Sequence, residues 1–207
     1  KLGDPKKAFL YASREKELFV ASTPARAILG NAINSSVALR EMNLPDQAIA
    51  AAAEGTRLTN AASGRPDRLA NAWTELAEAQ LVKGMLADAD KSVHTALLIL
   101  DTMKHSESGL AEQSIRKGAS LFFLGRLQMA RGESAAAHQT MEEAVNRFRD
   151  AAGSNHISRD AGKVCTAMGY NLAAMNRYDS AIDYFRQALV FTIPAYQAYK
   201  GMLPPVQ

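Results

Sequence analysis

The chain has 207 residues, 47% of them apolar, which is enough to bury a core within one domain or one elongated array. Its net charge is +3, and the lysines and arginines are scattered, which argues against a nucleic-acid partner. The single cysteine, Cys165, excludes an internal disulfide and a Cys-rich zinc site, and no apolar run reaches the roughly 18 residues of a membrane span.

Frequent alanine and few aromatic residues favour an all-α protein, because alanine is the best helix former. Four prolines stand where a helix would begin, since proline suits the first helical turn: Pro5, Pro24, Pro45 and Pro194. The segment Ser63–Pro66 is a clear break between helices. In chain order we expect helices at 1–22, 24–42, 45–62, 67–83, 86–103, 110–131, 134–151, 157–175, 178–192 and 194–201.

An internal repeat runs through these helices. Alanines recur at spacings of 40, 41, 48 and 44 residues: Ala8, Ala48, Ala89, Ala137 and Ala181. Five residues before each stands a residue that tolerates the left-handed backbone of a tight turn: Gly3, Asn43, Gly84, Gly132 and Asn176. Small residues recur twelve before the last four alanines (Ser36, Ala77, Gly125, Gly169) and seven after them (Gly55, Ala96, Ala144, Ala188). They would let two antiparallel helices approach closely.

This pattern resembles the tetratricopeptide repeat, a helix-turn-helix unit. The clearest unit comprises Met168–Leu172, Asn176–Ile182, Tyr184–Phe185 and Ala188–Leu189, followed by the unit Trp73–Leu97. The period exceeds the usual 34 residues, which predicts lengthened helices and a longer loop near 104–109. The resemblance implies an all-α fold of antiparallel helical hairpins stacked in a right-handed superhelix. We expect a single array over 1–207, with a half hairpin at 1–22, hairpins at 24–62, 67–103, 110–151 and 157–192, and a final helix at 194–201.

Two short segments, Lys1–Ala8 and Ser158–Asp160, are similar to tetratricopeptide tails of bacterial Ser/Thr protein kinases. Long-period arrays also occur in bacterial transcription regulators that contain tetratricopeptide repeats. The resemblance therefore leaves an alternative open: a regulatory or sensory segment of a larger signalling protein. The repeat begins in mid-pattern, so we read the sequence as a fragment. The compartment stays open, cytoplasmic by default and extracytoplasmic for the tail of a membrane-anchored kinase.

Stacked hairpins of this family bind extended or helical peptides in a concave groove lined by their first helices. Helical phase selects one stripe on each first helix, which mixes apolar anchors with cations: Ile33, Val37 and Arg40, then Asn71, Thr74 and Glu78, then Phe122, Arg126 and Met129, and last Lys163, Thr166 and Tyr170. Aromatic residues at helical spacing also suit a core, and of Phe122 and Phe123 we expect one packed and one accessible. A pairing of Arg126 with Glu78 is the alternative to partner contact by those two residues.

No catalytic constellation is visible. The four histidines, His94, His105, His138 and His156, lack the spacing of a helical zinc site, and Cys165 lies on an apolar stripe that favours a buried thiol. We therefore expect no enzyme activity, no cofactor and no metal. The expected partner is a protein or peptide, with no nucleic acid and no membrane contact by this segment. The half hairpin at 1–22 leaves an apolar face, which favours either further repeats upstream or self-association.

Overall fold

Each turn between paired helices is set by a residue with a left-handed backbone. The four predicted turn residues in the described chain have positive φ angles of 60°, 81°, 79° and 58°: Asn43, Gly84, Gly132 and Asn176. In the first turn the amides of Asn43 and Leu44 donate to the carbonyls of Arg40 and Leu39, each at 2.9 Å. These two bonds satisfy carbonyls that the end of a helix leaves unpaired. The turn prediction is confirmed at these positions, whereas Gly3 lies outside the described residues.

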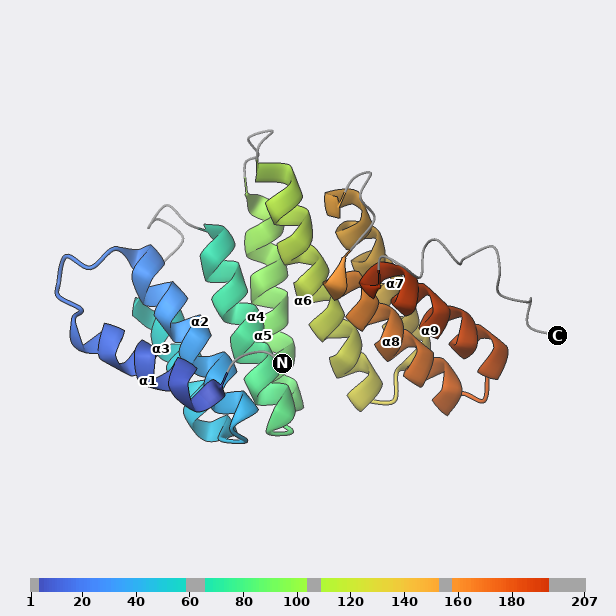
Figure 1. Cartoon of the computed structure of the whole chain (residues 1–207), viewed down its shortest axis with the longest axis horizontal. Coiled ribbons are helices and arrows are strands. Elements are labelled where there is room, and N and C mark those ends of the chain that lie inside the picture. Colours follow the sequence, from blue (N-terminus) through green and yellow to red (C-terminus); the bar gives the residue numbers. More distant parts are fainter. Residues whose placement is uncertain (1–3, 59–65, 104–108, 153–157, 194–207) are drawn as a thin grey trace. The chain divides into compact units, whose positions relative to one another are not determined.

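The structure, a computed structural model, describes residues 4–58, 66–103, 109–152 and 158–193 (Figure 1). Over these ranges it consists of nine α-helices without a strand, so the all-α prediction is confirmed. The helices are α1 (Pro5–Glu17), α2 (Ala25–Glu41), α3 (Pro45–Leu58), α4 (Pro66–Val82), α5 (Leu86–Thr102), α6 (Leu110–Ala130), α7 (Ser134–Ala152), α8 (Arg159–Ala174) and α9 (Tyr178–Thr192). None of them is long and apolar enough to cross a bilayer.

The first helix begins where the sequence predicts and ends earlier. The Oδ1 atom of Asp4 accepts from the amides of Lys6 and Lys7 at 3.0 and 3.4 Å, which caps α1. The helix ends at Glu17 rather than near residue 22. Just beyond it, the Val20 amide donates to the Thr23 hydroxyl at 2.7 Å and closes a turn. The predicted helix at 194–201 and the loop at 104–108 lie outside the described residues.

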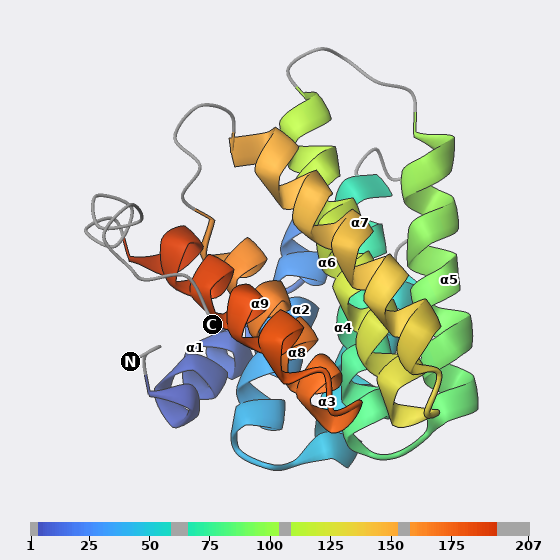
Figure 2. The same ribbon diagram turned by 90° about the vertical axis from the view of Figure 1, so that its right-hand side faces the viewer.

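The chain divides into two compact units, residues 1–104 and residues 105–207. In the first unit α2 packs on α3 and α4 on α5, while α1 lies against α2 and α3 against α4. In the second unit α6 packs on α7 and α8 on α9, and α8 also contacts both α6 and α7. Figure 2 shows α6 and α7 side by side along their lengths. A single right-handed superhelix over 1–207 stays a prediction.

Close approach within each hairpin depends on the small residues of the repeat. The alanines Ala48, Ala89, Ala137 and Ala181 are at most 2% exposed, whereas Ala8 on α1 is exposed. A Cβ atom added at Gly125 would lie 2.6 Å from Met141 Cγ, and one at Gly55 would lie 2.4 Å from Ala32 Cβ. Since real Cβ atoms do not approach so closely, these positions accept no larger residue without a shift. The small-residue pattern is thereby explained as helix packing.

Candidate binding surfaces

The first helix of the last hairpin presents the most accessible part of the predicted stripe. On α8, Lys163 and Tyr170 are exposed, and 65% of the Tyr170 side chain is open to solvent. The Tyr170 ring meets the ring of Phe185 edge to face, with centroids 5.2 Å apart. Phe185 in turn occupies the space beside Gly169, where an added Cβ would lie 2.5 Å from its Cε1 atom. Tyr170 is therefore an exposed aromatic side chain whose ring contacts a packed phenylalanine, Phe185.

Two other polar residues of this stripe have partners on their own helix. The Lys163 Nζ atom lies 2.9 Å from Asp160 Oδ1, and both side chains are more than half exposed. Such a surface ion pair contributes only about 0–1 kcal/mol, so a carboxylate of a partner can exchange with Asp160. The Thr166 hydroxyl donates to the Gly162 carbonyl at 2.9 Å. Lys163 is consequently an accessible cation of α8 that is held only by a surface ion pair.

On α6 the predicted aromatic residue and the predicted arginine form one cluster. The guanidinium carbon of Arg126 lies 5.8 Å from the ring centroid of Phe122 and 5.6 Å from that of Phe123. The two rings are 5.6 Å apart, and all three side chains are half-buried. Arg126 lies over both rings, and the expectation that one phenylalanine packs while the other is accessible stays a prediction. Met129, one turn further along α6, is half-buried as well.

In the first unit Arg40, the cation predicted to line the groove, forms ion pairs with two glutamates. The Arg40 Nη1 atom lies 3.0 Å from Glu75 Oε2 and 2.7 Å from Glu78 Oε2, joining α2 to α4. All three side chains are only 13–16% exposed. Burial raises the pKa of Glu75, and the charge of Glu78 adds to the rise, while Arg40 opposes it. Arg40, expected as a groove cation, thus lies between two carboxyl groups of its own chain.

The remaining predicted residues on α2 and α4 contribute little accessible surface. Thr74 is a correction, because it is 1% exposed and its hydroxyl donates to the Ala70 carbonyl at 3.0 Å. Ile33 packs against the buried cluster of Leu29, Leu69 and Ala72. Ile33, Val37 and Asn71 are all half-buried. Helical phase located the stripe but could not tell which of its members pack against a neighbouring helix.

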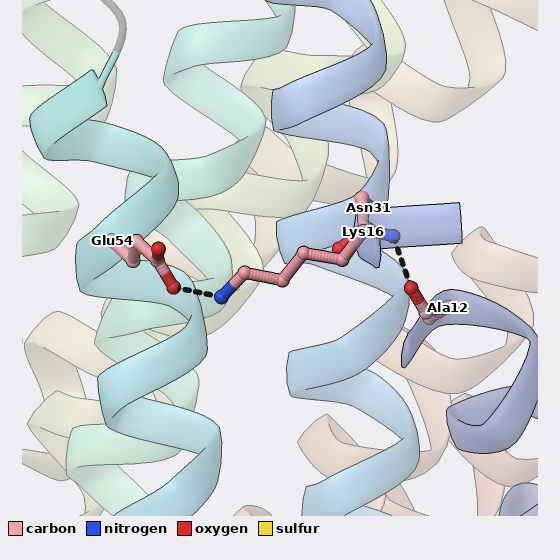
Figure 3. Close-up of polar contacts among 4 residues, drawn as sticks. All are labelled: Ala12, Lys16, Asn31 and Glu54. Carbon is pink, nitrogen blue, oxygen red and sulfur yellow. Dashed lines mark hydrogen bonds and ion pairs between the residues drawn. The ribbon is translucent and has the colours of Figure 1, made fainter. Parts of the chain in front are cut away.

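A cavity of about 560 Å³ lies between α1, α2 and α3, and the sequence did not predict it. Its walls are mostly apolar and include Phe9, Phe19, Ile28, Leu39 and Leu58. Figure 3 shows two polar contacts made by residues next to this cavity. Asn31 on α2 donates from Nδ2 to the Ala12 carbonyl of α1 at 2.6 Å, and Lys16 of α1 reaches across to pair with Glu54 of α3. These two contacts join the three helices around the cavity.

Two titratable side chains of the second unit have raised pKa values. Cys165 is fully buried, which confirms the buried-thiol prediction, and burial raises the pKa of its thiol to about 11. Burial, together with a 2.9 Å hydrogen bond from its hydroxyl to Glu142, also raises the pKa of Tyr184. His138 packs edge-on against the Tyr184 ring. Among the described residues, which exclude His105 and His156, no three metal-ligating side chains gather.

No protein-family profile and no curated protein sequence matches this chain. Solved structures do match it. One crystal structure of MamA aligns over 98% of both chains at 15% identity, with a TM-score of 0.55. A second MamA structure aligns over 99% of this chain and 98% of that one at 14% identity, with a TM-score of 0.52. BtubC (BKLC) from P. vanneervenii aligns over 99% of this chain and 78% of its own at 14% identity, with a TM-score of 0.65.

These neighbours are tetratricopeptide-like helical-repeat proteins. Identities of 14–15% carry information about the fold alone. Together with the left-handed turns and the small packing positions, they support a tetratricopeptide-like helical-repeat fold for this chain.

Proposed function

We propose that this chain is a protein-interaction module that binds a peptide or a partner protein through the first helices of its hairpins, with α8 as the main contact. The observation that carries the proposal is Tyr170, an aromatic side chain that is 65% exposed yet braced against Phe185. Tyrosine and arginine are enriched among the residues that dominate binding energy at protein interfaces. Because contact with Phe185 already restrains the Tyr170 ring, the ring loses little conformational freedom when a partner packs on it.

The α8 stripe defines the chemistry of a fitting partner. Lys163 precedes Tyr170 by two helical turns on the same face, which separates them by about 10 Å along the helix. A partner segment with an apolar or aromatic side chain and, about 10 Å away, a carboxylate would meet both residues. The apolar group would pack on Tyr170, and the carboxylate would exchange with Asp160 at Lys163.

The remaining stripe residues extend this proposal in each unit. In the second unit we extend the proposed surface to Phe122, Arg126 and Met129 of α6, a helix that contacts α8. In the first unit Arg40 and Glu78 are only 16% and 13% exposed and pair with each other, so they form the less accessible part of the proposed surface. A regulatory segment of a larger signalling protein would bind its partner in the same way, so that alternative needs no separate site.

A peptide selection on the whole chain tests the proposal. We would select displayed random peptides on the wild-type chain and measure their affinity for Tyr170→Ala and for Tyr178→Ala. Tyr178 is a matched control because it is 60% exposed but lies at the start of α9, outside the predicted stripe. The proposal expects peptides that lose affinity for Tyr170→Ala alone. Equal affinity for the wild type and both variants would overturn it.

A further inference from the structure

The cavity between α1, α2 and α3 exists because the first full hairpin has small residues at two repeat positions. Sixteen and thirteen residues before the repeat alanine, this hairpin has Ala32 and Ser35, which both line the cavity. The corresponding pairs in the later hairpins are Trp73 with Leu76, Leu121 with Leu124, and Cys165 with Met168. The large members of those pairs fill their cores: Leu76 is 5% exposed and Met168 is fully buried. The first hairpin thus lacks the side chains that close the same space elsewhere.

One hydroxyl group of the lining, that of Ser35, is open to this space. Ser35 is 7% exposed and lines the cavity, and its hydroxyl makes no hydrogen bond within the described residues. By contrast, neighbouring Asn31 is satisfied through Nδ2, which donates to the Ala12 carbonyl and to Glu15 Oε2. Unlike the Oγ atom of neighbouring Ser36, which is fully buried without a partner, the Ser35 Oγ atom keeps accessible surface and so stays open to the cavity. Ser35 is therefore a point where a ligand atom would gain a hydrogen bond.

The charges at the rim limit the kind of ligand. Lys16 and Glu54 pair with each other across the edge of the cavity, so neither offers an uncompensated charge (Figure 3). Glu17, the third titratable residue in the lining, is solvent-exposed at the end of α1. The rest of the wall consists largely of alanines, aromatic rings and aliphatic side chains. A charged ligand would lose its hydration in this space without a free counter-charge.

We propose that this cavity binds a small, uncharged and mainly apolar molecule with one hydrogen-bonding group, which meets the Ser35 hydroxyl. The volume of about 560 Å³ lies within the range of about 300–1,000 Å³ that small-molecule sites occupy. Mostly apolar walls with a few polar groups are the usual composition of such sites, and here Ser13, Asn31 and Gln47 line the cavity together with Ser35. The site is separate from the α8 surface, because α1, α2 and α3 all belong to the first unit.

A fluorescence titration of the whole chain with N-phenyl-1-naphthylamine, an uncharged apolar dye with one N–H group, tests the site. The wild-type chain is expected to bind one dye molecule with micromolar affinity. Ser35→Leu introduces the leucine that the second and third hairpins carry at this repeat position, and it should lower the affinity by about tenfold or more. The control Arg26→Leu adds the same side chain at an exposed position of α2 outside the cavity lining and should leave the affinity unchanged.

Thermal unfolding is measured in parallel to show that the variants are folded. If Ser35→Leu does not fold, Ala51→Leu fills the cavity from α3, at the repeat position where the last hairpin has Tyr184. Absence of dye binding by the wild type, or unchanged affinity of a folded filled variant, would overturn the proposal. Tyr170→Ala should not affect dye binding, so this proposal and the peptide-binding proposal fail independently.

Discussion

The ring of Phe185 fills the space where a side chain at Gly169 would stand, with Cε1 2.5 Å from the position of an added Cβ. The same ring contacts Tyr170, the neighbour of Gly169 and the most exposed aromatic residue of the α8 stripe. A packing requirement inside the last hairpin and the presentation of an exposed aromatic side chain on its surface thus depend on one phenylalanine. Changes at Gly169 should consequently affect both stability and binding.

Gly169→Ala should destabilise the chain by about 1–3 kcal/mol, because overpacking forces the Phe185 ring out of its place. Urea unfolding monitored by circular dichroism measures this change. Gly30→Ala is the matched control, since Gly30 also lies within a helix but has no atom within 4 Å of an added Cβ. It should stabilise the chain by about 0.5–1 kcal/mol through helix propensity. Effects of the same sign in both variants would contradict this packing argument.

Glu75→Gln should become more stabilising, relative to the wild type, as the pH rises. The pKa of Glu75 is raised above its ordinary value of 4.5 in the folded chain, chiefly by burial. The unfolded chain therefore ionises this group at lower pH, and the wild type loses stability as pH rises through the folded pKa. The amide of the variant has no such loss, and Arg40 keeps its bond to Glu78.

Thermal unfolding at a series of pH values from about 4 to 8 measures this difference. Glu41→Gln, an exposed carboxylate at the end of α2, is the control and should show no comparable trend. A difference between Glu75→Gln and the wild type that shrinks with rising pH would show that the sign of the argument is wrong.

Cys165 should not react with a disulfide reagent such as Ellman's reagent in the folded chain at pH 8. Its thiol is fully buried, and burial raises its pKa to about 11, so the reactive thiolate is scarce as well as inaccessible. In denaturant one thiol per chain should react rapidly. Fast stoichiometric labelling under native conditions would mean that α8 opens readily or that the thiol is accessible.

Trp73→Ala should cost about 3 kcal/mol of stability, since removal of a large core side chain leaves a cavity. Trp73 is half-buried and packs against two buried clusters, one that includes Leu29 and Leu69 and one that includes Leu100. Denaturant unfolding gives the change. Leu98→Ala, at a side chain that is 64% exposed on α5, is the control and should shift stability by less than about 0.5 kcal/mol.

The features that the sequence predicted correctly are those for which the local backbone or packing geometry accepts few residue types. Asn43, Gly84, Gly132 and Asn176 were predicted from their tolerance of a left-handed backbone, and all four adopt it. The small positions were likewise recognised by their recurrence, and Gly125 and Gly169 lie directly against second-helix side chains. Both features are properties of single hairpins and repeat along the chain.

Features that depend on which side chains meet across helices were not predictable. Arg40 was expected to face a partner, but its ion pairs are with Glu75 and Glu78 on another helix, 35 and 38 residues away in sequence. Helical phase predicts on which side of its own helix a residue lies, but it does not predict which side chains of another helix contact that residue. The cavity was missed for a related reason, although its signal was present. Ser35 stands where the other hairpins have Leu76, Leu124 and Met168, and only a comparison at that position reveals the missing volume.

The central claim is that the exposed, braced aromatic residue of α8 is the main contact for a partner. The most direct measurement is the affinity of a selected peptide for the wild-type chain, Tyr170→Ala and Tyr178→Ala by isothermal titration calorimetry. We expect a loss of about 2 kcal/mol, or about thirtyfold, for Tyr170→Ala and less than about twofold for Tyr178→Ala. Unchanged binding by a folded Tyr170→Ala chain, or an equal loss in both variants, would contradict it.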